Sequence, residues 1–541
     1  MDELSVARRI ILDLRTFNGS PLTRLNDFWK GIFRTWPIAG VVLFAENCES
    51  SEQVKALCCE IQSASINGAL GHPCLIAIDQ EGGRVMRTHS AMTTAMPGAM
   101  SIAATGGQAA SHAEFVAKHM ALELNELGIN WNFAPCVDVN SDPRNPVINV
   151  RSFSSDARRV VELAERQLQG FRAGGVLNCI KHFPGHGNTS IDSHVGLAST
   201  LAESFEEAMN EAEVFNQLIR GGNVDAVMTA HLQSPYLDDS TLSTKGNESC
   251  TVPATFSSRI LIDLLRDDFR FDGVVISDAL DMGAVAEHFT PSDALCRTLQ
   301  SGCDLALMPL AIDCNASSET FERLLKSVSR KLQESSGYSN ESALRRIEAL
   351  HHRIRLSPSA IVPREVKEQA ARRCAEIWHQ SITEVAACPL VDVSQSVAVY
   401  GPESLAKRVI EVLRKYNIMA GFEDARAQRA IVLSMFPFES PVEAGGLATF
   451  HPIKPGPTVE DTLVLVNELL VLGKQVDVFS FRSPEWLGRL PNTVGALACY
   501  DYRLPIFEEA CVPVIESLCK IWAQNLPAPG VLPVNLLEES A

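Results

Sequence analysis

Residues 176–194 have the sequence Val-Leu-Asn-Cys-Ile-Lys-His-Phe-Pro-Gly-His-Gly-Asn-Thr-Ser-Ile-Asp-Ser-His. The apolar, β-branched beginning, residues 176–180, is typical of a buried strand. Ionisable side chains follow at once, namely Lys181, His182, His186, Asp192 and His194. A packed core tolerates such groups only when they are paired, and a solvated loop gains nothing from the stiffness of Phe-Pro-Gly. The stretch therefore indicates a strand whose carboxyl end carries chemistry, although for His186 alone a structural role is favoured.

Seven further short apolar runs repeat this arrangement, with helix-length segments between them. Asp79, His182, His231 and Asp278 each lie at the carboxyl end of a different run. Strands that alternate with helices predict an α/β fold of the (β/α)8 barrel type, which builds its active site at the carboxyl ends of its strands. The eight runs are 10–14, 40–44, 74–79, 129–134, 178–183, 225–230, 273–278 and 303–308, and the clearest amphipathic helices are predicted at 157–172 and 204–220.

After residue 308 the pattern changes to charged helical sequence at 319–331 and 341–355, followed by two prolines, Pro358 and Pro363. Strand and helix patterns then alternate again, which predicts a smaller doubly wound α/β domain. Its strands are expected at 397–400, 430–434, 462–466, 475–481 and 493–499. We therefore divide the chain into a catalytic barrel (1–356), a linker (357–390) and a C-terminal α/β domain (391–541).

Composition excludes several classes of function. The 541 residues carry 47 basic and 65 acidic side chains, a net charge of −18, which argues against nucleic acid or an anionic membrane as the main partner. The 15 cysteines are scattered through apolar runs, as expected for buried free thiols in a reducing compartment. The acidic start of the chain has no signal-peptide pattern and no later run reaches membrane-spanning length, so a cytoplasmic location is expected.

The segment from Lys181 to His194 resembles the signature of glycoside hydrolase family 3, in particular its β-N-acetylhexosaminidase branch. Four further motifs occur in the order that the family has them. They are Ala77-Ile-Asp-Gln-Glu-Gly-Gly-Arg-Val85, Asn132-Phe-Ala-Pro135, Arg151-Ser-Phe153 and Val275-Ile-Ser-Asp-Ala-Leu-Asp-Met282. The chain departs from the resemblance at Asn149-Val150, where the family commonly has glycine and an acidic residue, and at Asn188, which replaces a frequent acidic residue.

The resemblance implies a role for each residue that matches a family motif. Asp278 corresponds to the nucleophile, and His194, held by Asp192, corresponds to the group that donates and later accepts a proton. Sugar-binding roles fall on Asp79, Arg87, Arg151, Lys181 and His182. These side chains suit such roles, because carboxylates accept hydrogen bonds from sugar hydroxyls while lysine and arginine donate them. For Arg84 an ordinary ion pair is favoured, and His231 is assigned no more than a role in shaping the site.

The sequence positions of Asp278 and His194 agree with retaining glycoside hydrolysis, which needs a carboxylate nucleophile and a proton donor near the leaving oxygen. Asp278 ends a predicted strand, so its backbone is fixed at the barrel mouth; the alternative role for it is a helix N-cap, which suits Asp281 better. A free histidine titrates at about pH 6.5, as a group that gives and then takes a proton should. We expect the Asp192–His194 dyad to swing over the bound sugar.

Three other functions have to be weighed against hydrolysis. The first is a β-N-acetylglucosaminide phosphorylase, because a neutral imidazole does not repel an incoming phosphate as a second carboxylate would. The second is a zinc-dependent barrel hydrolase with His182, His186, Asp192 and His194 as ligands, although barrel metal sites usually take ligands from several strand ends. The third is a sugar-binding protein without catalysis, which the presence of both nucleophile and dyad opposes.

The sequence thus predicts a retaining exo-β-N-acetylglucosaminidase that needs neither metal nor other cofactor. It would release non-reducing terminal N-acetylglucosamine from a small carbohydrate substrate, either a muropeptide in peptidoglycan recycling or a chitin oligosaccharide. The sequence does not choose between these substrates, nor between a monomer and a homodimer, and it does not say what the C-terminal domain contributes.

Overall fold

Eight parallel strands form a closed barrel in the N-terminal part of the computed structural model, which describes residues 2–189, 197–335, 337–354, 361–435, 457–501 and 508–534. Around the barrel the strands follow chain order. Hydrogen bonds from Asn132 N to Leu177 O (2.8 Å) and from Cys179 N to Ala134 O (3.0 Å) close the sheet. The strands are β1 (Ile10–Asp13), β4 (Gly40–Leu43), β5 (Leu75–Ile78), β6 (Trp131–Asn132), β7 (Ile180–Phe183), β9 (Ala226–Thr229), β13 (Val274–Ala279) and β14 (Leu305–Leu307).

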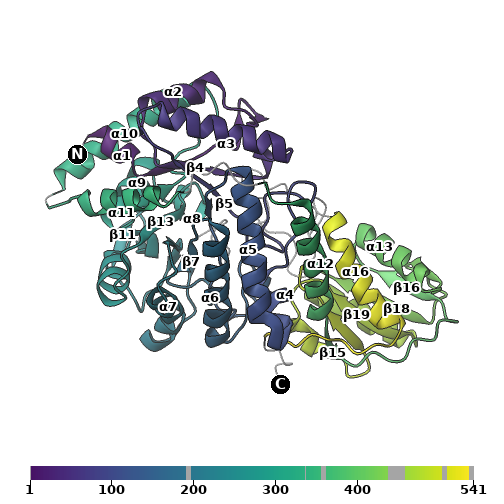
Figure 1. The fold of residues 1–541 in the computed structure, drawn as a ribbon. Coiled ribbons are helices and arrows are strands. Elements are labelled where there is room, and N and C mark those ends of the chain that lie inside the picture. Colours follow the sequence, from purple (N-terminus) through teal and green to yellow (C-terminus); the bar gives the residue numbers. More distant parts are fainter. Residues whose placement is uncertain are drawn as a thin grey trace.

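Each of these strands overlaps one of the eight predicted runs, so the prediction of a (β/α)8 barrel is confirmed. Residues of β4 and β5 are buried throughout, which explains why they are continuously apolar rather than alternating. The helices that follow the strands cover the outside of the barrel (Figure 1). They include α2 (Asp27–Thr35), α3 (Ser51–Ile66), α5 (Ala109–Leu127), α6 (Ala157–Gly174), α7 (Phe205–Arg220), the π-type helix η5 (Arg259–Asp268), α9 (Pro291–Gln300), α10 (Ser317–Glu334) and α11 (Glu341–His352).

Local sequence sets the ends of the two helices that were predicted most clearly. The Asp156 side chain caps α6 by accepting a hydrogen bond from Arg158 N, and the helix ends at Gly175, whose φ of 83° is left-handed. Ser204 caps α7 by accepting from Glu207 N, and acidic residues occupy the first turn. The polypeptide therefore leaves α6 and enters β7 at a fixed position, which places Lys181 and His182 at the barrel mouth.

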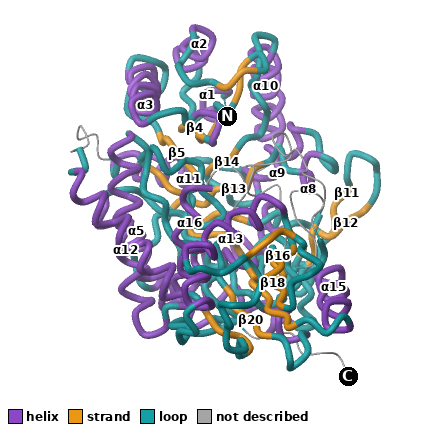
Figure 2. Tube along the Cα trace, turned by 90° about the vertical axis from the view of Figure 1, so that its right-hand side faces the viewer, coloured by secondary structure: helices purple, strands orange, loops and turns teal. Residues whose placement is uncertain are grey.

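The C-terminal domain is built on a six-stranded sheet in the order β15-β20-β19-β18-β16-β17, parallel except for β15 at one edge. Figure 2 shows α13 and α16 on one side of this sheet and α15 on the other, so the prediction of a doubly wound domain is confirmed. The elements are β15 (Thr383–Ala386), β16 (Val397–Tyr400), α13 (Glu403–Lys415), β17 (Ala420–Phe422), β18 (Arg429–Ser434), α15 (Val459–Val471), β19 (Gln475–Ser480), β20 (Gly495–Ala498) and α16 (Glu508–Ala523).

One predicted strand of this domain is wrong. Residues 462–466 lie inside helix α15, which begins with a reciprocal hydrogen-bonded cap between Thr458 and Asp461. Its buried residues, Val459, Thr462, Val466 and Leu469, are three or four residues apart, which is the helical period. The helix resembled a strand because its interior is a short run of leucine and valine, for which periodicity alone does not separate the two structures.

The segment predicted as a linker, 357–390, contains α12 (Arg364–Ser381) and β15 in its described part. Helix α12 binds the barrel through an ion pair between Lys367 Nζ and Glu126 Oε2 of α5 (2.7 Å). Near the end of the described chain, Val531 N donates to Ala104 O (2.8 Å) in α4 (Ala99–Ala104). The described parts of the barrel and the C-terminal domain are thus joined by direct contacts as well as by the covalent chain.

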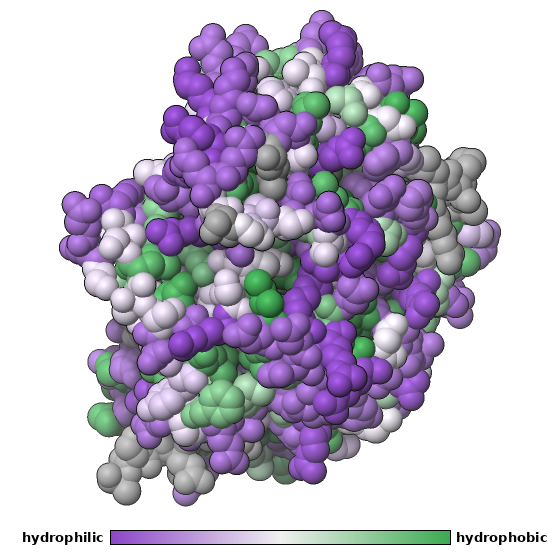
Figure 3. Space-filling view, turned by 90° about the vertical axis from the view of Figure 1, so that its left-hand side faces the viewer, coloured by the Kyte–Doolittle hydropathy of each residue, from purple (hydrophilic) through white to green (hydrophobic). Residues whose placement is uncertain are grey.

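The barrel face that points away from the C-terminal domain is mostly hydrophilic, with scattered apolar patches (Figure 3). Within the described ranges, every helix is too short or too polar to span a lipid bilayer.

Candidate active site

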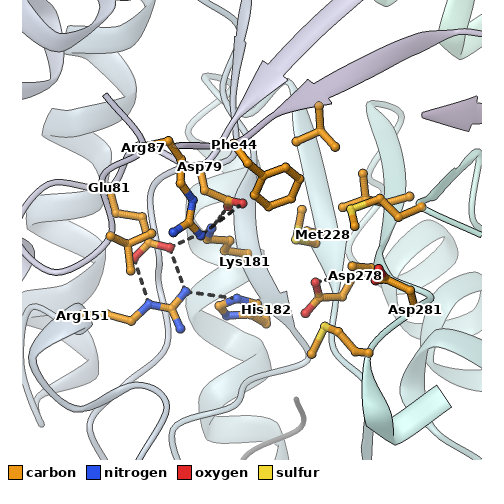
Figure 4. Close-up of a pocket in the computed structure, with 16 residues that line it drawn as sticks. Phe44, Asp79, Glu81, Arg87, Arg151, Lys181, His182, Met228, Asp278 and Asp281 are labelled. Carbon is orange, nitrogen blue, oxygen red and sulfur yellow. Dashed lines mark hydrogen bonds and ion pairs between the residues drawn. The ribbon is translucent and has the colours of Figure 1, made fainter. Parts of the chain in front are cut away.

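A pocket at the carboxyl ends of the barrel strands collects most of the ionisable residues that the sequence singled out (Figure 4). Asp79 follows β5, Lys181 and His182 belong to β7, and Asp278 lies near the end of β13. The sequence predictions for six residues therefore converge on one cavity. The six are Asp79, Arg87, Arg151, Lys181, His182 and Asp278.

A buried network of charges forms one wall of the pocket. Lys181 Nζ lies 2.6 Å from Asp79 Oδ1 and 2.7 Å from Glu81 Oε1. Arg151 binds the same Glu81 carboxylate with two nitrogens, Nε at 2.9 Å and Nη2 at 2.7 Å. The bidentate geometry holds both the position and the orientation of the guanidinium group. Each cation keeps further N–H groups beyond these bonds, so the wall can also donate to a ligand.

The charges in this network stabilise one another. Burial alone would raise the pKa of Glu81, but the positive charges of Arg151 and Lys181 outweigh it and hold that pKa well below its usual range. Burial would lower the pKa of Lys181, yet the carboxylates of Asp79 and Glu81 raise it above its usual value. Both groups are therefore charged over the whole physiological pH range.

His182 is oriented by a carboxylate that the sequence did not single out. Its Nδ1 lies 2.7 Å from Asp138 Oδ2, and Asp138 also accepts from the backbone N–H of His186 (2.8 Å). Burial would raise the pKa of Asp138, but the neighbouring imidazole of His182 lowers it below its usual value. The ionised carboxylate holds the proton on Nδ1, so Nε2 faces the pocket, 3.4 Å from Arg151 Nη2.

Asp278 occupies the opposite side of the pocket (Figure 4). Its side chain is half-buried, and Oδ1 accepts a hydrogen bond from Ala279 N (2.8 Å). His231 fixes the same turn, because its Nε2 contacts Ala279 O (2.9 Å) while Nδ1 contacts Thr255 Oγ1 (2.9 Å). One face of the cavity thus carries a fixed carboxylate and the other face carries hydrogen-bond donors.

Arg87 lies beside the charged wall. Its Nη2 is 3.9 Å from Asp79 Oδ2, and its guanidinium is 5.8 Å from the centre of the Phe44 ring. The side chain is 4% exposed, and its backbone N–H donates to Gln80 Oε1 (2.7 Å). The guanidinium therefore lies near the carboxyl end of β5, where a ligand that contacts Asp79 could also reach it.

Two predicted catalytic residues, Asp192 and His194, lie outside the described residues. The capping role predicted for Asp281 is wrong: α8 (Gly283–Ala286) has Met282 as its N-cap residue, and Asp281 lines the pocket. His186 is buried and bonds Thr189 Oγ1 through Nδ1 (2.8 Å), in agreement with a structural role.

Sequence reasoning assigned no role to Glu81, Asp138 or Phe44. Glu81 lies in the motif Ala77–Val85, two residues after Asp79, so its place after β5 already indicated a residue at the barrel mouth. Asp138 follows the β6 run in the same way. Phe44 directly follows β4, but an apolar residue there looks like core.

Of the four proposed zinc ligands, His182 and His186 have their Nδ1 atoms bonded to Asp138 and Thr189, and Asp192 and His194 lie outside the described residues. Among the described residues, Cys136, Asp138 and His182 bring their ligand atoms within 4.8 Å of one another. Burial raises the pKa of the Cys136 thiol well above its usual value, so that it can donate to Asp138 Oδ2 at 3.2 Å. Hydrogen bonding accounts for this cluster without a metal.

Comparisons with known proteins show the family to which the chain belongs. The family model described as Glycosyl hydrolase family 3 N terminal domain matches residues 14–347. Beta-hexosaminidase A of Pseudoalteromonas piscicida is 33% identical over 577 residues, covering 98% of this chain and 96% of that protein. A beta-hexosaminidase of Pseudomonas aeruginosa is 34% identical over 335 residues, which cover 60% of this chain and 92% of that protein.

Among solved structures, a glycoside hydrolase family 3 beta-N-acetylglucosaminidase from Paenibacillus sp. str. FPU-7 superposes with a TM-score of 0.78 at 26% identity, covering 99% of this chain and 98% of that chain. The beta-glucoside phosphorylase BglX has the same fold, with a TM-score of 0.77 at 20% identity over 99% of this chain and 93% of that chain.

Proposed function

This chain belongs to glycoside hydrolase family 3, and we propose that it is a retaining exo-β-N-acetylglucosaminidase that releases non-reducing terminal N-acetylglucosamine. The observation that carries the proposal is the placement of the Asp278 carboxylate across one pocket from the donors Lys181 and Arg151. A retaining enzyme needs this division, with a nucleophile on one side of the sugar ring and binding groups elsewhere around it. The names of the P. piscicida relative and the Paenibacillus structure support the choice of sugar.

In the proposed mechanism Asp278 attacks the anomeric carbon and forms a glycosyl-aspartate. His194, oriented by Asp192, protonates the leaving oxygen and then removes a proton from the water that hydrolyses the intermediate. Because an enzymic carboxylate is present, the 2-acetamido group need not act as a nucleophile. Residues 1–356 would form the catalytic barrel in this scheme.

The charged wall provides the proposed sugar-binding groups. Lys181 and Arg151 would donate to hydroxyl or acyl oxygens, while Asp79 accepts from a hydroxyl. The Nε2 of His182 is an acceptor as long as Asp138 holds the proton on Nδ1. Arg87, close to Asp79, completes the set. Every one of these groups is already held by a neighbour, so binding would need little reordering of side chains.

A small carbohydrate is the proposed substrate, either a muropeptide or a chitin oligosaccharide, and the proposed location is the cytoplasm. The net charge of −18 supports the absence of nucleic-acid and membrane partners. A monomer and a homodimer are both compatible with this proposal.

Product analysis tests the proposal directly. The purified protein is incubated with chitobiose and with a muropeptide, each with and without inorganic phosphate. We expect free β-configured N-acetylglucosamine as the first product and no dependence on phosphate. N-acetylglucosamine 1-phosphate as the product would assign the phosphorylase reaction instead, and the absence of any product from both substrates and from an aryl β-N-acetylglucosaminide would refute the proposal.

A further inference from the structure

The turn η3 (Asn149–Arg151) connects the pocket to the C-terminal domain through three consecutive residues. The side chain of Asn149 donates from Nδ2 to Ser483 Oγ (3.3 Å), beyond the end of β19. Val150 is 2% exposed and belongs to one apolar cluster with C-terminal-domain residues such as Val432 and Trp486. Arg151 then points into the pocket and binds Glu81. The backbone that carries Arg151 is therefore held from behind by the other domain.

The two residues before Arg151 are also those at which the chain departs from the family pattern. Asn149 has a φ of 39°, in the left-handed region that glycine adopts freely and asparagine tolerates. Asparagine thus keeps the backbone conformation and adds a side-chain amide that reaches Ser483. A valine at position 150 fits an apolar interdomain cluster, whereas an acidic side chain there would be buried without a partner. Both departures suit contact with the C-terminal domain.

A second hydrogen bond joins the same barrel loop to the same place. The carboxylate of Glu485 accepts from Asn140 Nδ2 (2.5 Å) and from the hydroxyl of Ser483. Glu485 is 1% exposed, and burial raises its pKa above the usual value. Ser483 and Glu485 therefore form a continuous hydrogen-bonded link from Asn140 to Asn149, two positions on the segment that leads from β6 to Arg151.

The loop that carries Glu81, the partner of Arg151, rests on the C-terminal domain as well. Asp501 Oδ2 accepts from Gly98 N (2.9 Å). A Cβ atom on Gly83 would lie 2.5 Å from Asp501 Oδ1, so that only glycine allows this approach. Both partners of the buried Glu81–Arg151 ion pair are thus carried by loops that contact the C-terminal domain.

We propose that Ser483 and Glu485 are positioning residues for substrate binding, which fix Arg151 through Asn149 and make the C-terminal domain part of the binding site. The assignment of Arg151 as a sugar ligand rests on the function proposed above. Loss of the Ser483 hydroxyl leaves Asn149 Nδ2 only the longer contact to Pro143 O (3.5 Å) among its described acceptors, and so loosens the η3 backbone. Arg151 then binds sugar less well, while Asp278, on the far side of the pocket, is unaffected.

The test is a double-mutant cycle on the full chain with an aryl β-N-acetylglucosaminide. Ser483→Ala is expected to raise KM about three- to tenfold, the range of one lost hydrogen bond, while kcat changes less than about twofold. Asn149→Gly keeps the left-handed backbone and should raise KM similarly. The double variant should be clearly less impaired than the sum of the two single effects, because both substitutions remove the Asn149–Ser483 bond. Each single variant also loses a bond of its own, from Asn149 to Pro143 O and Val150 N or from Ser483 to Glu485. Ser483→Thr retains the hydroxyl and should restore KM.

The matched control is Ser394→Ala, an exposed serine of the same domain that bonds only to Asp392 among the contacts described for it. It should leave KM, kcat and the melting temperature unchanged. An unchanged KM in Ser483→Ala would overturn the inference. Additive effects in the double variant would do the same, as would parallel losses of kcat and melting temperature without a change in KM.

Hydrogen–deuterium exchange separates this inference from the proposed function. Amides of residues 147–151 should exchange faster in Ser483→Ala than in the wild type and in Ser394→Ala. Faster exchange in Ser483→Ala, in a protein whose wild type has no glycosidase activity, would support the positioning role and refute the proposed function. Unchanged exchange in an active protein would reject the positioning role and keep the function.

Discussion

The two parallel sheets of this protein use the same structural edge in different ways. In the barrel, polar residues at the carboxyl ends of β5, β7 and β13 point into an open pocket. In the C-terminal domain, three described polar residues that follow β19 and β20, namely Ser483, Glu485 and Asp501, bond to barrel loops instead. The carboxyl edge of a doubly wound sheet is where such domains usually bind ligands. In the described part of the chain, the residues named at this edge contact the neighbouring barrel loops, so a position at the carboxyl edge does not by itself say what a residue does.

Buried ion pairs show the same contrast. Arg429 and Asp477 of the C-terminal sheet are 1% and 0% exposed, with Arg429 Nη2 2.7 Å from Asp477 Oδ2. Nη2 also donates to Pro389 O, Nη1 donates to Leu390 O and Nε donates to Asp477 Oδ2, so all three nitrogens of the guanidinium have structural partners. Lys181, equally buried, faces a cavity. Ion pairing alone thus does not separate Lys181, which is proposed to bind sugar, from the structural Arg429; the cavity beside Lys181 does.

The largest expected effect is that of Asp278→Asn. The substitution keeps the shape of the side chain and removes the charge of the nucleophile, so kcat for all β-glycosides should fall by several orders of magnitude while the melting temperature stays near that of the wild type. A 2-fluoro sugar without the acetamido group should label the wild type at Asp278, as measured by mass spectrometry of peptides. Labelling of another residue, or substantial turnover in a preparation free of deamidated protein, would refute the assignment.

His194→Ala should come next and should depend on the leaving group. Poor leaving groups need protonation, and their rate is expected to fall about 10²- to 10⁴-fold, whereas acidic phenols depart unaided. The glycosyl-enzyme should then accumulate, and azide should release it as glycosyl azide. Asp192→Ala should give a milder form of the same pattern. Rates across a series of aryl leaving groups measure this; an equal loss on every leaving group without glycosyl azide would make His194 a binding residue.

A matched pair of substitutions sharpens the comparison of the ion pairs. Lys181→Met and Asp477→Asn each leave a buried charge short of a partner, so both should destabilise the protein by about 3–5 kcal/mol. Only Lys181→Met should lower kcat/KM, by about ten- to a hundredfold, because it also removes a charged donor to the sugar. Denaturant unfolding and steady-state kinetics below the unfolding transition measure the two effects. A comparable loss of kcat/KM in Asp477→Asn would remove the distinction.

Much of the barrel could be predicted because each strand is buried on both faces and therefore appears as a short apolar run. Five of the six pocket residues followed from their position at the ends of such runs or from the motifs that they belong to, whereas Arg87 followed from the family resemblance alone. In the C-terminal domain, residues 462–466 were assigned to a strand because a short apolar run fits both structures. Strands β15 and β17 were missed because they are short edge strands, with exposed or half-buried residues and little hydrophobic pattern.

Contacts between distant segments could not be predicted from the sequence. Asp138 contacts His182 across the barrel seam, and although its place after the β6 run was a signal, nothing in the local sequence named His182 as its partner. Asn149 and Val150 were visible as departures from the family pattern, but the sequence did not show their contacts, which are Ser483, 334 residues after Asn149, and an apolar cluster with C-terminal-domain residues. Such pairings are set by the packing of the two domains.

The smallest expected effect concerns Glu211, a barrel glutamate that, like Glu485, accepts hydrogen bonds from a barrel loop and has a pKa raised by burial. Glu211 on α7 is partly buried and accepts from Gly187 N (3.1 Å) and Ser141 Oγ (2.6 Å), at the start of the segment that leads to Asp192. Burial raises its pKa from 4.5 to about 7, and the nearby charge of Asp138 acts in the same direction, against the hydrogen bond from Ser141. Between these two pH values the folded protein binds more protons than the unfolded chain. The stabilisation from Glu211 is therefore complete below about pH 4.5 and is lost as the pH rises through about 7.

Glu211→Gln removes the ionisation, so the stability of the variant relative to wild type should increase between pH 5 and pH 8 by on the order of 2 kcal/mol. Urea unfolding of both proteins at these two pH values measures the difference, with Glu213→Gln on the same helix as the control. If Glu213→Gln changed the pH dependence as much as Glu211→Gln, the effect would belong to the charge of α7 as a whole and not to the carboxyl that holds the active-site loop.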